Sequence, residues 1–279
     1  MNKEEIAIKQ LQDYCPKDGY YLAFSGGKDS CVVKELLNRA GVPYEAVYRV
    51  TSVDPPELVR FIKDKHPDVA REVPRDENGK PVTMWNLIPR KGMPPTFRAR
   101  YCCAELKETG GDGRFTVTGV RWEESVRRRR NHGTVDIRKG KGLEFLKDIE
   151  GIEERERGFV LVNDNDESRR TIEHCIKRAK VMINPIVSWS SSDVWGYIIK
   201  NKISYCELYE QGFDRLGCIG CPLICSEKRK MEFDRWPKYK EAYILAFGKL
   251  MEKLKQQGKL ENSKFGTSAE TMFRWWLKE

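Results

Sequence analysis

The stretch Tyr20-Tyr21-Leu22-Ala23-Phe24-Ser25-Gly26-Gly27-Lys28-Asp29-Ser30 decides the fold of this chain. It opens on an apolar run that predicts a strand, and residues 31–40 have the apolar spacing of a helix that stops at Gly41. Two glycines between strand and helix let the backbone turn tightly and approach a ligand closely. Backbone N–H groups at the helix start and the Lys28 ammonium can then face phosphate oxygens. The stretch therefore predicts a pyrophosphate cradle, and the alternative is a plain glycine turn with a solvated lysine. The spacing between the glycines and Lys28 is too short for the Gly-x4-Gly-Lys-Ser/Thr loop of common NTPases.

This loop resembles the signature of the PP-loop ATP pyrophosphatase superfamily, whose members cleave ATP between the α and β phosphates and usually leave AMP on a substrate oxygen. The resemblance implies that ATP is bound together with Mg²⁺, with Lys28 and Asp29 in catalytic roles. The implied ligands of the pyrophosphate end are Ser25, Gly26, Gly27, Lys28, Asp29 and Ser30. An oxygen-only Mg²⁺ site suits such a loop, because Mg²⁺ keeps most of its waters and needs few protein ligands.

Composition narrows the class of protein. The chain has 279 residues, 39% of them hydrophobic, so it can bury one large core or a core and a smaller lobe. No apolar run approaches the ~20 residues of a membrane span, and the start lacks a signal-peptide pattern, so we expect a cytoplasmic protein with no membrane association. The formal net charge of +9 favours polyanionic ligands, either a nucleotide or a nucleic acid.

Nine cysteines give a second signal. In a chain expected to be cytoplasmic, they favour metal binding or redox chemistry over structural disulfides. Two pairs stand out, Cys102-Cys103 and the Cys-x-x-Cys of Cys218 and Cys221. Four thiolates from two short segments suit an iron–sulfur cluster, with structural zinc or no metal as alternatives.

Both cysteine pairs resemble those of the phosphoadenosine/adenosine phosphosulfate reductase family, a branch of the same superfamily. Its cluster-bearing members hold [4Fe-4S] with a Cys-Cys pair and a later Cys-x-x-Cys. The resemblance implies that Cys102, Cys103, Cys218 and Cys221 bind a [4Fe-4S] cluster, with Cys225 as an alternative ligand or a free thiol.

Further motifs extend the resemblance. Asp54 opens an Asp-Pro-Pro-Glu turn at the next strand end, a position that family members use near the adenosine. The family pattern Gly-x-Arg-x-x-Glu-Ser-x-x-Arg is matched by Gly119, Arg121, Glu124, Ser125 and Arg128, which are implied to bind the nucleotide, with Arg121 catalytic. The run 127–130 is all arginine and is expected to hold a polyanion at the mouth of the site, with a solvated surface as the alternative.

Alternating strands (20–24, 44–50, 115–120) and helices predict an α/β fold with a doubly wound, mostly parallel sheet and a helical C-terminal region. We expect a nucleotide-binding core over 1–130, an insertion over 131–180 that covers the active-site face, the end of the core over 181–225 and a helical region over 226–279. Within the insertion, 163–167 predicts a polar turn before a helix that ends at Lys180. The aromatic residues of 226–279 are expected to form a core rather than a base-stacking surface.

Two departures separate this chain from the reductases of the family. Those enzymes have Ala-Glu in place of Gly-Lys, whereas Gly27 and Lys28 are intact here, and they use a cysteine near the C-terminus, whereas none follows Cys225. The chain instead resembles the ATP pyrophosphatase components of sulfur-insertion systems, such as those that make DNA phosphorothioate or thiolated tRNA. This resemblance implies an AMP-forming ATP pyrophosphatase that adenylates an acceptor for sulfur transfer. Nucleic acid is the expected acceptor, and a cysteine desulfurase or another sulfur donor is the expected partner. The alternatives are an adenosine or phosphoadenosine phosphosulfate reductase and a non-catalytic nucleotide- or nucleic-acid-binding subunit.

Overall fold

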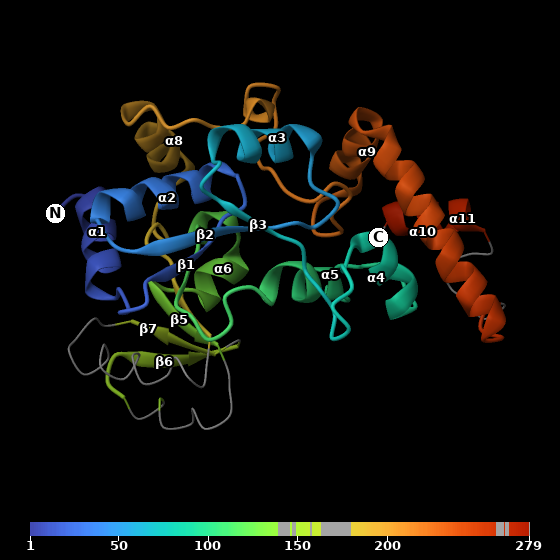
Figure 1. The fold of residues 1–279 in the computed structure, drawn as a ribbon, viewed down its shortest axis with the longest axis horizontal. Helices are drawn as coiled ribbons and strands as arrows, with labels where there is room; N and C mark the ends of the chain where they lie inside the picture. Colours follow the sequence, from blue (N-terminus) through green and yellow to red (C-terminus); the bar gives the residue numbers. More distant parts are fainter. Residues whose placement is uncertain are drawn as a thin grey trace. The chain divides into compact units, whose positions relative to one another are not determined.

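The computed structural model describes residues 1–138, 146, 149–156, 158–162, 180–260, 265 and 268–278. The chain forms two compact units (Figure 1). The first unit comprises residues 1–48, 60–71 and 110–212, and the second comprises 49–59, 72–109 and 213–279. No helix of the described residues is both long and apolar enough to cross a membrane.

An eight-stranded sheet runs in the order β3-β2-β1-β4-β8-β5-β7-β6. The strands in chain order are β1 Tyr20–Ala23, β2 Tyr44–Arg49, β3 Ala70–Glu72, β4 Thr116–Val117, β5 Val135–Arg138, β6 Ile152–Arg155, β7 Gly158–Leu161 and β8 Val181–Ile183. Strand β1 is parallel to β2 on one side and to β4 on the other, and β4 is parallel to β8. The strand order therefore reverses between β1 and β4, which is where open α/β sheets bind ligands, outside the carboxyl ends of the strands. The predicted α/β fold with a mostly parallel sheet is confirmed.

Three further strands extend the sheet beyond β8. Strand β5 pairs antiparallel with β8, β7 with β5, and β6 with β7. These strands fall in the segment 131–180 that the sequence marks as an insertion. The predicted polar turn at 163–167 and the body of the helix after it lie outside the described residues.

Helix α2, Lys28–Ala40, follows β1 and ends at Gly41, whose φ of 66° is left-handed and suits glycine. Helices α1 (Lys3–Asp13) and α8 (Ser191–Lys200) both pack against α2. The side chain of Ser190 accepts a hydrogen bond from the Asp193 N–H and caps α8. After β4 come the short 3₁₀ turn η2 (Trp122–Glu124) and α6 (Val126–Asn131), while α3 (Pro56–Lys65) has residues in both units.

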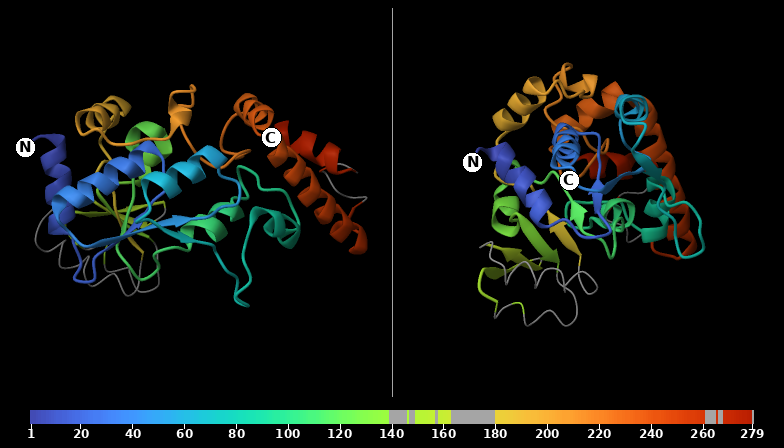
Figure 2. Two further views of the ribbon diagram at one scale, coloured as in Figure 1. Left: turned by 45° about the horizontal axis from the view of Figure 1, so that its top comes forward. Right: turned by 60° about the vertical axis from the view of Figure 1, so that its left-hand side comes forward.

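The second unit is mainly helical. Its elements are α4 (Met84–Lys91), α5 (Tyr101–Cys103), the π-helical turn η1 (Ala104–Glu108), α9 (Ser226–Arg235), α10 (Pro237–Gln256) and α11 (Ala269–Lys278). Helix α10 packs against α4, α9 and α11, and Figure 2 shows it as the long orange helix beside α11. Trp276 is fully buried, and its ring contacts those of Phe233, Tyr243, Phe247 and Phe273. The prediction that these aromatic residues form a core is confirmed.

Candidate functional site

The loop after β1 has the geometry of an anion cradle. Gly26 has a φ of 73°, which a side chain would disfavour, and Gly27 is the N-cap of α2 without a side-chain cap. Ser30 Oγ lies 2.8 Å from the Gly27 carbonyl oxygen, to which it donates, and accepts from the Ser25 N–H at 3.3 Å. The loop is thus closed by its own serines, with the start of α2 and its positive dipole end beside it.

Cys31 lies behind this loop and is buried. Its thiol is 3.8 Å from the Gly26 carbonyl oxygen and 3.8 Å from His66 Nε2. Burial raises the pKa of the Cys31 thiol to about 12. Since the thiolate is the reactive form, Cys31 supports the loop and is not a nucleophile at neutral pH.

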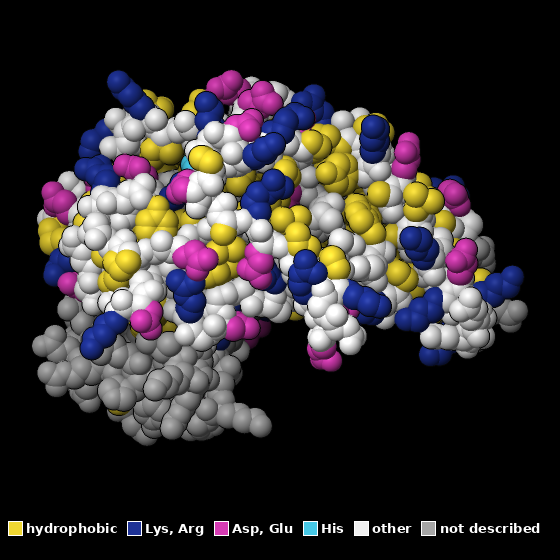
Figure 3. Space-filling model, in the orientation of Figure 1, with side chains coloured by type: hydrophobic (Ala, Val, Ile, Leu, Met, Phe, Trp, Pro, Cys, Tyr) yellow, Lys and Arg dark blue, Asp and Glu magenta, His cyan; other side chains and the backbone are white. Residues whose placement is uncertain are grey.

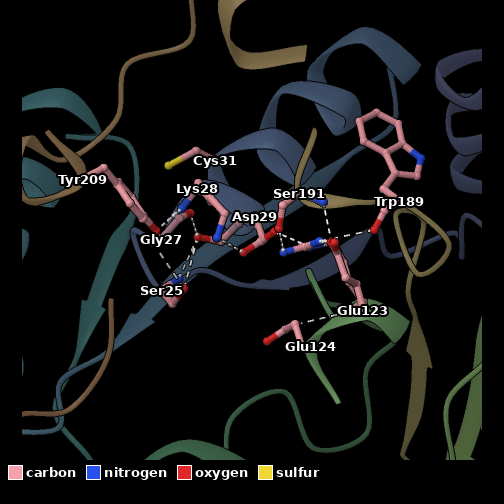
Figure 4. A network of polar contacts seen from close by, with 12 residues as sticks. Ser25, Gly27, Lys28, Asp29, Cys31, Glu123, Glu124, Trp189, Ser191 and Tyr209 are labelled. Atoms are coloured by element: carbon pink, nitrogen blue, oxygen red, sulfur yellow. Dashed lines mark hydrogen bonds and ion pairs between the residues drawn. The ribbon is translucent and has the colours of Figure 1, made fainter. Parts of the chain in front are cut away.

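Lys28 is held at the base of the loop, with only 6% of its surface exposed. The backbone N–H of Lys28 donates to the Tyr209 hydroxyl at 2.9 Å, and the Lys28 ammonium lies 5.5 Å from the centre of the Tyr209 ring (Figure 4). Burial raises the pKa of Tyr209, so its hydroxyl stays protonated. Tyr209 therefore holds both the backbone and the side chain of Lys28 at the start of α2.

An ion pair joins this loop to the strand beside it. Arg121 Nε lies 2.6 Å from Asp29 Oδ1, and Arg121 is 2% exposed. Gly119 makes the approach possible, because a Cβ there would lie 3.0 Å from the Asp29 Cβ and 3.1 Å from its carbonyl carbon. Asp29 also lies 3.4 Å from the Lys28 ammonium. A carboxylate is thus held between a lysine and a buried arginine at the point where the strand order reverses.

The Nη1 and Nη2 groups of Arg121 bind Glu123 in the turn η2 and two residues around the start of α8. Nη1 donates to Glu123 Oε2 at 2.7 Å and to the Trp189 carbonyl oxygen at 3.3 Å, and Nη2 donates to Ser191 Oγ at 3.4 Å (Figure 4). The hydrogen bond from Arg121 is the main cause that lowers the pKa of the exposed Glu123. Arg121 therefore ties β4, α2 and the start of α8 together.

The rest of the arginine motif is mainly bound to its neighbours. Glu124 accepts from the Arg121 N–H at 3.2 Å and pairs with Arg128, and Ser125 caps α6 by accepting from the Arg128 N–H. Arg127 is exposed and pairs with Glu156 at 2.7 Å. Glu124 and Ser125 thus hold the turn after β4 in place, whereas the arginines of α6 lie on the surface.

The structure brings together the predicted residues of the first unit: the loop from Ser25 to Ser30, Gly119, Arg121, Glu124, Ser125 and Arg128. Sequence reasoning missed Tyr209, Glu123 and Ser191 as members of this network. Glu123 lies inside the arginine motif, which was a usable signal. Tyr209 is 181 residues from Lys28, and no local pattern marks it.

The four predicted cysteines all belong to the second unit. Cys102 and Cys103 lie in α5, directly before the π-helical turn, a rare element that is frequent at functional sites. Cys218 and Cys221 are joined by a turn in which the Cys221 N–H donates to the Cys218 carbonyl oxygen at 3.2 Å. Charges on Cys103, Cys218 and Cys221 contribute to raising the pKa of Cys102, after its hydrogen bond with Cys103 and its burial. Cys102 and Cys103 are adjacent in α5, and Cys218 and Cys221 are joined by one turn, so the second unit holds two pairs of thiols.

Cationic and acidic side chains accompany these cysteines. Arg100 Nη2 lies 3.5 Å from Cys103 Sγ, and the charge of Cys218 is the main cause that raises the pKa of Lys107. The Gly220 N–H donates to Glu232 Oε2 at 2.7 Å, which fixes the turn between Cys218 and Cys221. Burial raises the pKa of Glu232 to about 7.

The residue types suit an iron–sulfur cluster, because two pairs of thiols with positive charges beside them can supply its thiolate ligands. Among the described residues, no three His, Cys, Asp or Glu side chains are already placed as ligands of one metal ion. Cys225 is exposed and is the N-cap of α9. Asp54 is buried in the second unit, and its carbonyl oxygen accepts from the Tyr239 hydroxyl at 2.9 Å, so its place near an adenosine stays a prediction.

Known proteins resemble this chain over most of its length. An uncharacterized protein of Methanocaldococcus jannaschii is 28% identical over 270 residues, which is 92% of this chain and 54% of that protein. Adenosine 5'-phosphosulfate reductase of Allochromatium vinosum is 23% identical over 248 residues, covering 84% of this chain and 80% of the reductase. Among solved structures, the U34-tRNA thiolase NcsA of Methanococcus maripaludis, described with its [4Fe-4S] cluster, is 14% identical with a TM-score of 0.40, covering 92% of this chain and 80% of that one.

The chain spans about half the length of the two archaeal relatives it matches, 54% of one and 45% of the other. The model of the phosphoadenosine phosphosulfate reductase domain matches residues 19–224, a range that begins just before β1 and ends after the Cys-x-x-Cys motif. This match covers well over half of the chain and includes the phosphate loop, the arginine motif and both cysteine pairs. The chain therefore belongs to the phosphoadenosine phosphosulfate reductase domain family.

Proposed function

We propose that this protein is an ATP pyrophosphatase that transfers AMP to an acceptor, with nucleic acid as the acceptor class, and so activates it for sulfur transfer. The observation that carries the proposal is the intact loop Ser25–Ser30 at the reversal of strand order, with Lys28 buried at its base. Lys28 and the start of α2 can bind the β and γ phosphates of ATP in addition to the contact of Lys28 with Asp29, 3.4 Å away. An adenosine phosphosulfate has no β or γ phosphate for these groups to bind.

Each residue of the network has a role that its contacts support. Lys28 and the first turn of α2 would bind the pyrophosphate end of ATP. Asp29 would share Mg²⁺ with the phosphates, as an oxygen ligand of the kind that Mg²⁺ prefers. Arg121 would hold Asp29 in place through the 2.6 Å ion pair, and Tyr209 would hold Lys28. In this geometry the leaving pyrophosphate is stabilised by groups that are already oriented.

The cysteines of the second unit are proposed to hold a [4Fe-4S] cluster through Cys102, Cys103, Cys218 and Cys221. Such a cluster, when bound, would supply electron transfer or a binding site for sulfur. Arg100 and Lys107 would offset the negative charge of the thiolates, and Glu232 would keep the Cys218–Cys221 turn in its shape.

Support for a nucleic-acid acceptor comes from charge. The net charge is +9, and residues 127–130 are four consecutive arginines on α6. On the face shown in Figure 3, however, Lys and Arg side chains are interspersed with Asp and Glu. The acceptor is therefore the part of the proposal that most needs a binding measurement.

The second candidate function is reduction of an adenosine phosphosulfate, which the family match over residues 19–224 favours. The two candidates differ in the nucleotide that they need. An adenylating ATP pyrophosphatase releases pyrophosphate from ATP and forms free AMP with water or attaches AMP to a nucleic-acid acceptor, whereas a reductase releases sulfite from a sulfonucleotide and needs an electron donor.

The test is turnover of [α-³²P]ATP with Mg²⁺ by anaerobically purified protein, with and without single-stranded DNA and transfer RNA. We expect AMP formation in the wild type and its loss in Lys28→Ala. Lys200→Ala is a matched control, because this lysine is exposed on α8 and pairs only with Glu4 among the described residues. Lys28→Ala that retains the wild-type rate would refute the role of the loop. Sulfite release from adenosine phosphosulfate without AMP formation from ATP would favour the reductase.

The acceptor class is tested by the salt dependence of binding. A nucleic-acid backbone held by arginines releases counterions, so affinity should fall about 0.7–0.9 log units per tenfold rise in salt for each phosphate neutralised. Changing Arg128 and Arg129 to alanine should reduce that slope for DNA or RNA. Absence of nucleic-acid binding at low salt would contradict the proposed acceptor.

A further inference from the structure

His132 and Asp136 form a side-chain pair that none of the motifs predicts. His132 follows α6, and Asp136 lies in β5. The distance from His132 Nδ1 to Asp136 Oδ2 is 2.5 Å, and the two side chains are 15% and 7% exposed. A histidine whose Nδ1 faces a buried carboxylate is the arrangement in which imidazole acts as an acid or base.

The Asp136 carboxylate is held in place from several directions. Its Oδ1 accepts the Gly133 N–H at 2.8 Å, and its Oδ2 accepts Asn184 Nδ2 at 2.9 Å. The Asn184 amide also donates to the Gly133 carbonyl oxygen at 2.8 Å. The side-chain oxygen of Asn184 accepts a hydrogen bond from the Thr118 hydroxyl at 2.5 Å. The orientation of Asp136 therefore does not depend on His132 alone.

These contacts fix the tautomer of His132. An ionised carboxylate only accepts hydrogen bonds, so the proton of neutral His132 lies on Nδ1 and points at Asp136. The basic lone pair is then on Nε2, which has no hydrogen-bond partner within the described part of the chain. The pair thus presents an oriented base whose Nε2 makes no hydrogen bond to the residues that the structure describes.

The sheet places this pair at the edge where the phosphate loop lies. Strand β5 runs antiparallel to β8, so its beginning meets the carboxyl end of β8, and the Asn184 N–H donates to the Thr134 carbonyl oxygen at 2.7 Å. Thr118, at the carboxyl end of β4, precedes Gly119, which contacts Asp29. From β1, which leads into the loop Ser25–Ser30, to β5 there are three strand spacings, or about 14 Å.

We propose that His132 is the general base of the adenylation step, oriented by Asp136. This inference rests on the proposed function and adds the group that activates the acceptor. The acceptor is then an oxygen nucleophile that carries a proton. Its oxygen forms a bond to the α-phosphorus of ATP, the bond from that phosphorus to the bridging oxygen breaks, and the electron pair leaves with pyrophosphate. The proton of the acceptor passes to His132 Nε2, and Asp136 stabilises the imidazolium that results.

The test uses the full-length, anaerobically purified protein with water as the probe acceptor, and then single-stranded DNA and transfer RNA. AMP formation is measured in the wild type, His132→Ala and His132→Gln. General-base catalysis typically contributes 10²–10⁴-fold, so we expect kcat to fall about 100-fold or more in both variants. The Kd of the ATP analogue AMPCPP should stay within about threefold, because His132 does not hold the phosphates. Added imidazole should restore part of the rate of His132→Ala, where a space is left, and not that of His132→Gln.

Asn131→Ala is the matched control, since Asn131 is the neighbouring residue and contacts only the Arg127 carbonyl oxygen and Glu156 among the described residues. It should retain the wild-type rate. Thermal unfolding shows whether each variant is folded, and the remaining contacts of Asp136 with Gly133 and Asn184 should preserve the fold. Wild-type turnover with an unchanged rate in His132→Ala, or a lost rate that imidazole does not restore, would overturn the base. A wild type that forms neither free AMP nor adenylated nucleic acid would overturn the proposed function itself, together with this inference.

Discussion

Replacing Arg121 with glutamine should destabilise the first unit and stop AMP formation. Arg121 is 2% exposed and holds Asp29 at 2.6 Å. Removing one partner of a buried ion pair costs about 3–5 kcal/mol, because the other charge is left uncompensated. The Asp29 side chain is 22% exposed and can recover some solvation, so we expect the lower end, about 3 kcal/mol. At about 2–4 °C per kcal/mol for a domain of this size, Tm should fall by roughly 6–12 °C.

A double-mutant cycle with Asp29→Asn isolates the pair from the other contacts of Arg121. Asp29→Asn alone should cost less than Arg121→Gln, and the two changes should be non-additive by about 1–2 kcal/mol. Glu123→Gln is the internal control, because Glu123 also pairs with Arg121 but is exposed, so its loss should leave Tm nearly unchanged. Thermal and urea unfolding give the stabilities, and [α-³²P]ATP turnover gives the activity. Additive changes, or a Tm for Arg121→Gln no lower than for Glu123→Gln, would refute the reasoning.

Three further changes test other parts of the molecule. Cys218→Ser should lower the iron and sulfide content and the visible absorbance of anaerobically purified protein, whereas Cys225→Ser should leave both unchanged; equal iron in the two variants would remove Cys218 from the ligand set. Burial lowers the pKa of His66 to about 4, so His66 is neutral in the fold and charged in the unfolded chain between pH 4 and its ordinary value of about 6.5. The free energy of unfolding should therefore fall by about 1–2 kcal/mol as pH drops through that range, after allowance for the partial exposure of His66. In His66→Gln this pH dependence should be weaker. A dependence of Tm on pH that is the same in the wild type and the variant would contradict this. Trp276→Ala empties the aromatic core of the second unit and should cost about 3–5 kcal/mol in urea unfolding, and a loss below about 1 kcal/mol would show that the core collapses around the gap.

Structural elements that depend only on residues close together in the sequence could be predicted. The strand before Ser25, the glycine turn and helix α2 follow from an apolar run, two small residues and helical spacing, all within about two dozen residues. The helix cap at Ser190 and the stop at Gly41 are likewise set by neighbouring residues. The extension of the sheet by β5, β7 and β6 was not predicted, because their pairing depends on contacts with β8.

The sequence by itself determined the phosphate loop, the arginine motif and the two cysteine pairs, because each is defined by the order and spacing of adjacent residues. Only the tertiary structure decided which side chains complete the site. Arg121 reaches Asp29 across 92 positions, and Lys28 is held by Tyr209 across 181. The His132–Asp136 pair is fixed by Asn184, 48 positions from Asp136. Such contacts depend on the register of β4, β8 and β5 at one edge of the sheet. That register is specified by which face of each strand is buried in the assembled sheet, so it joins residues that are far apart in the sequence.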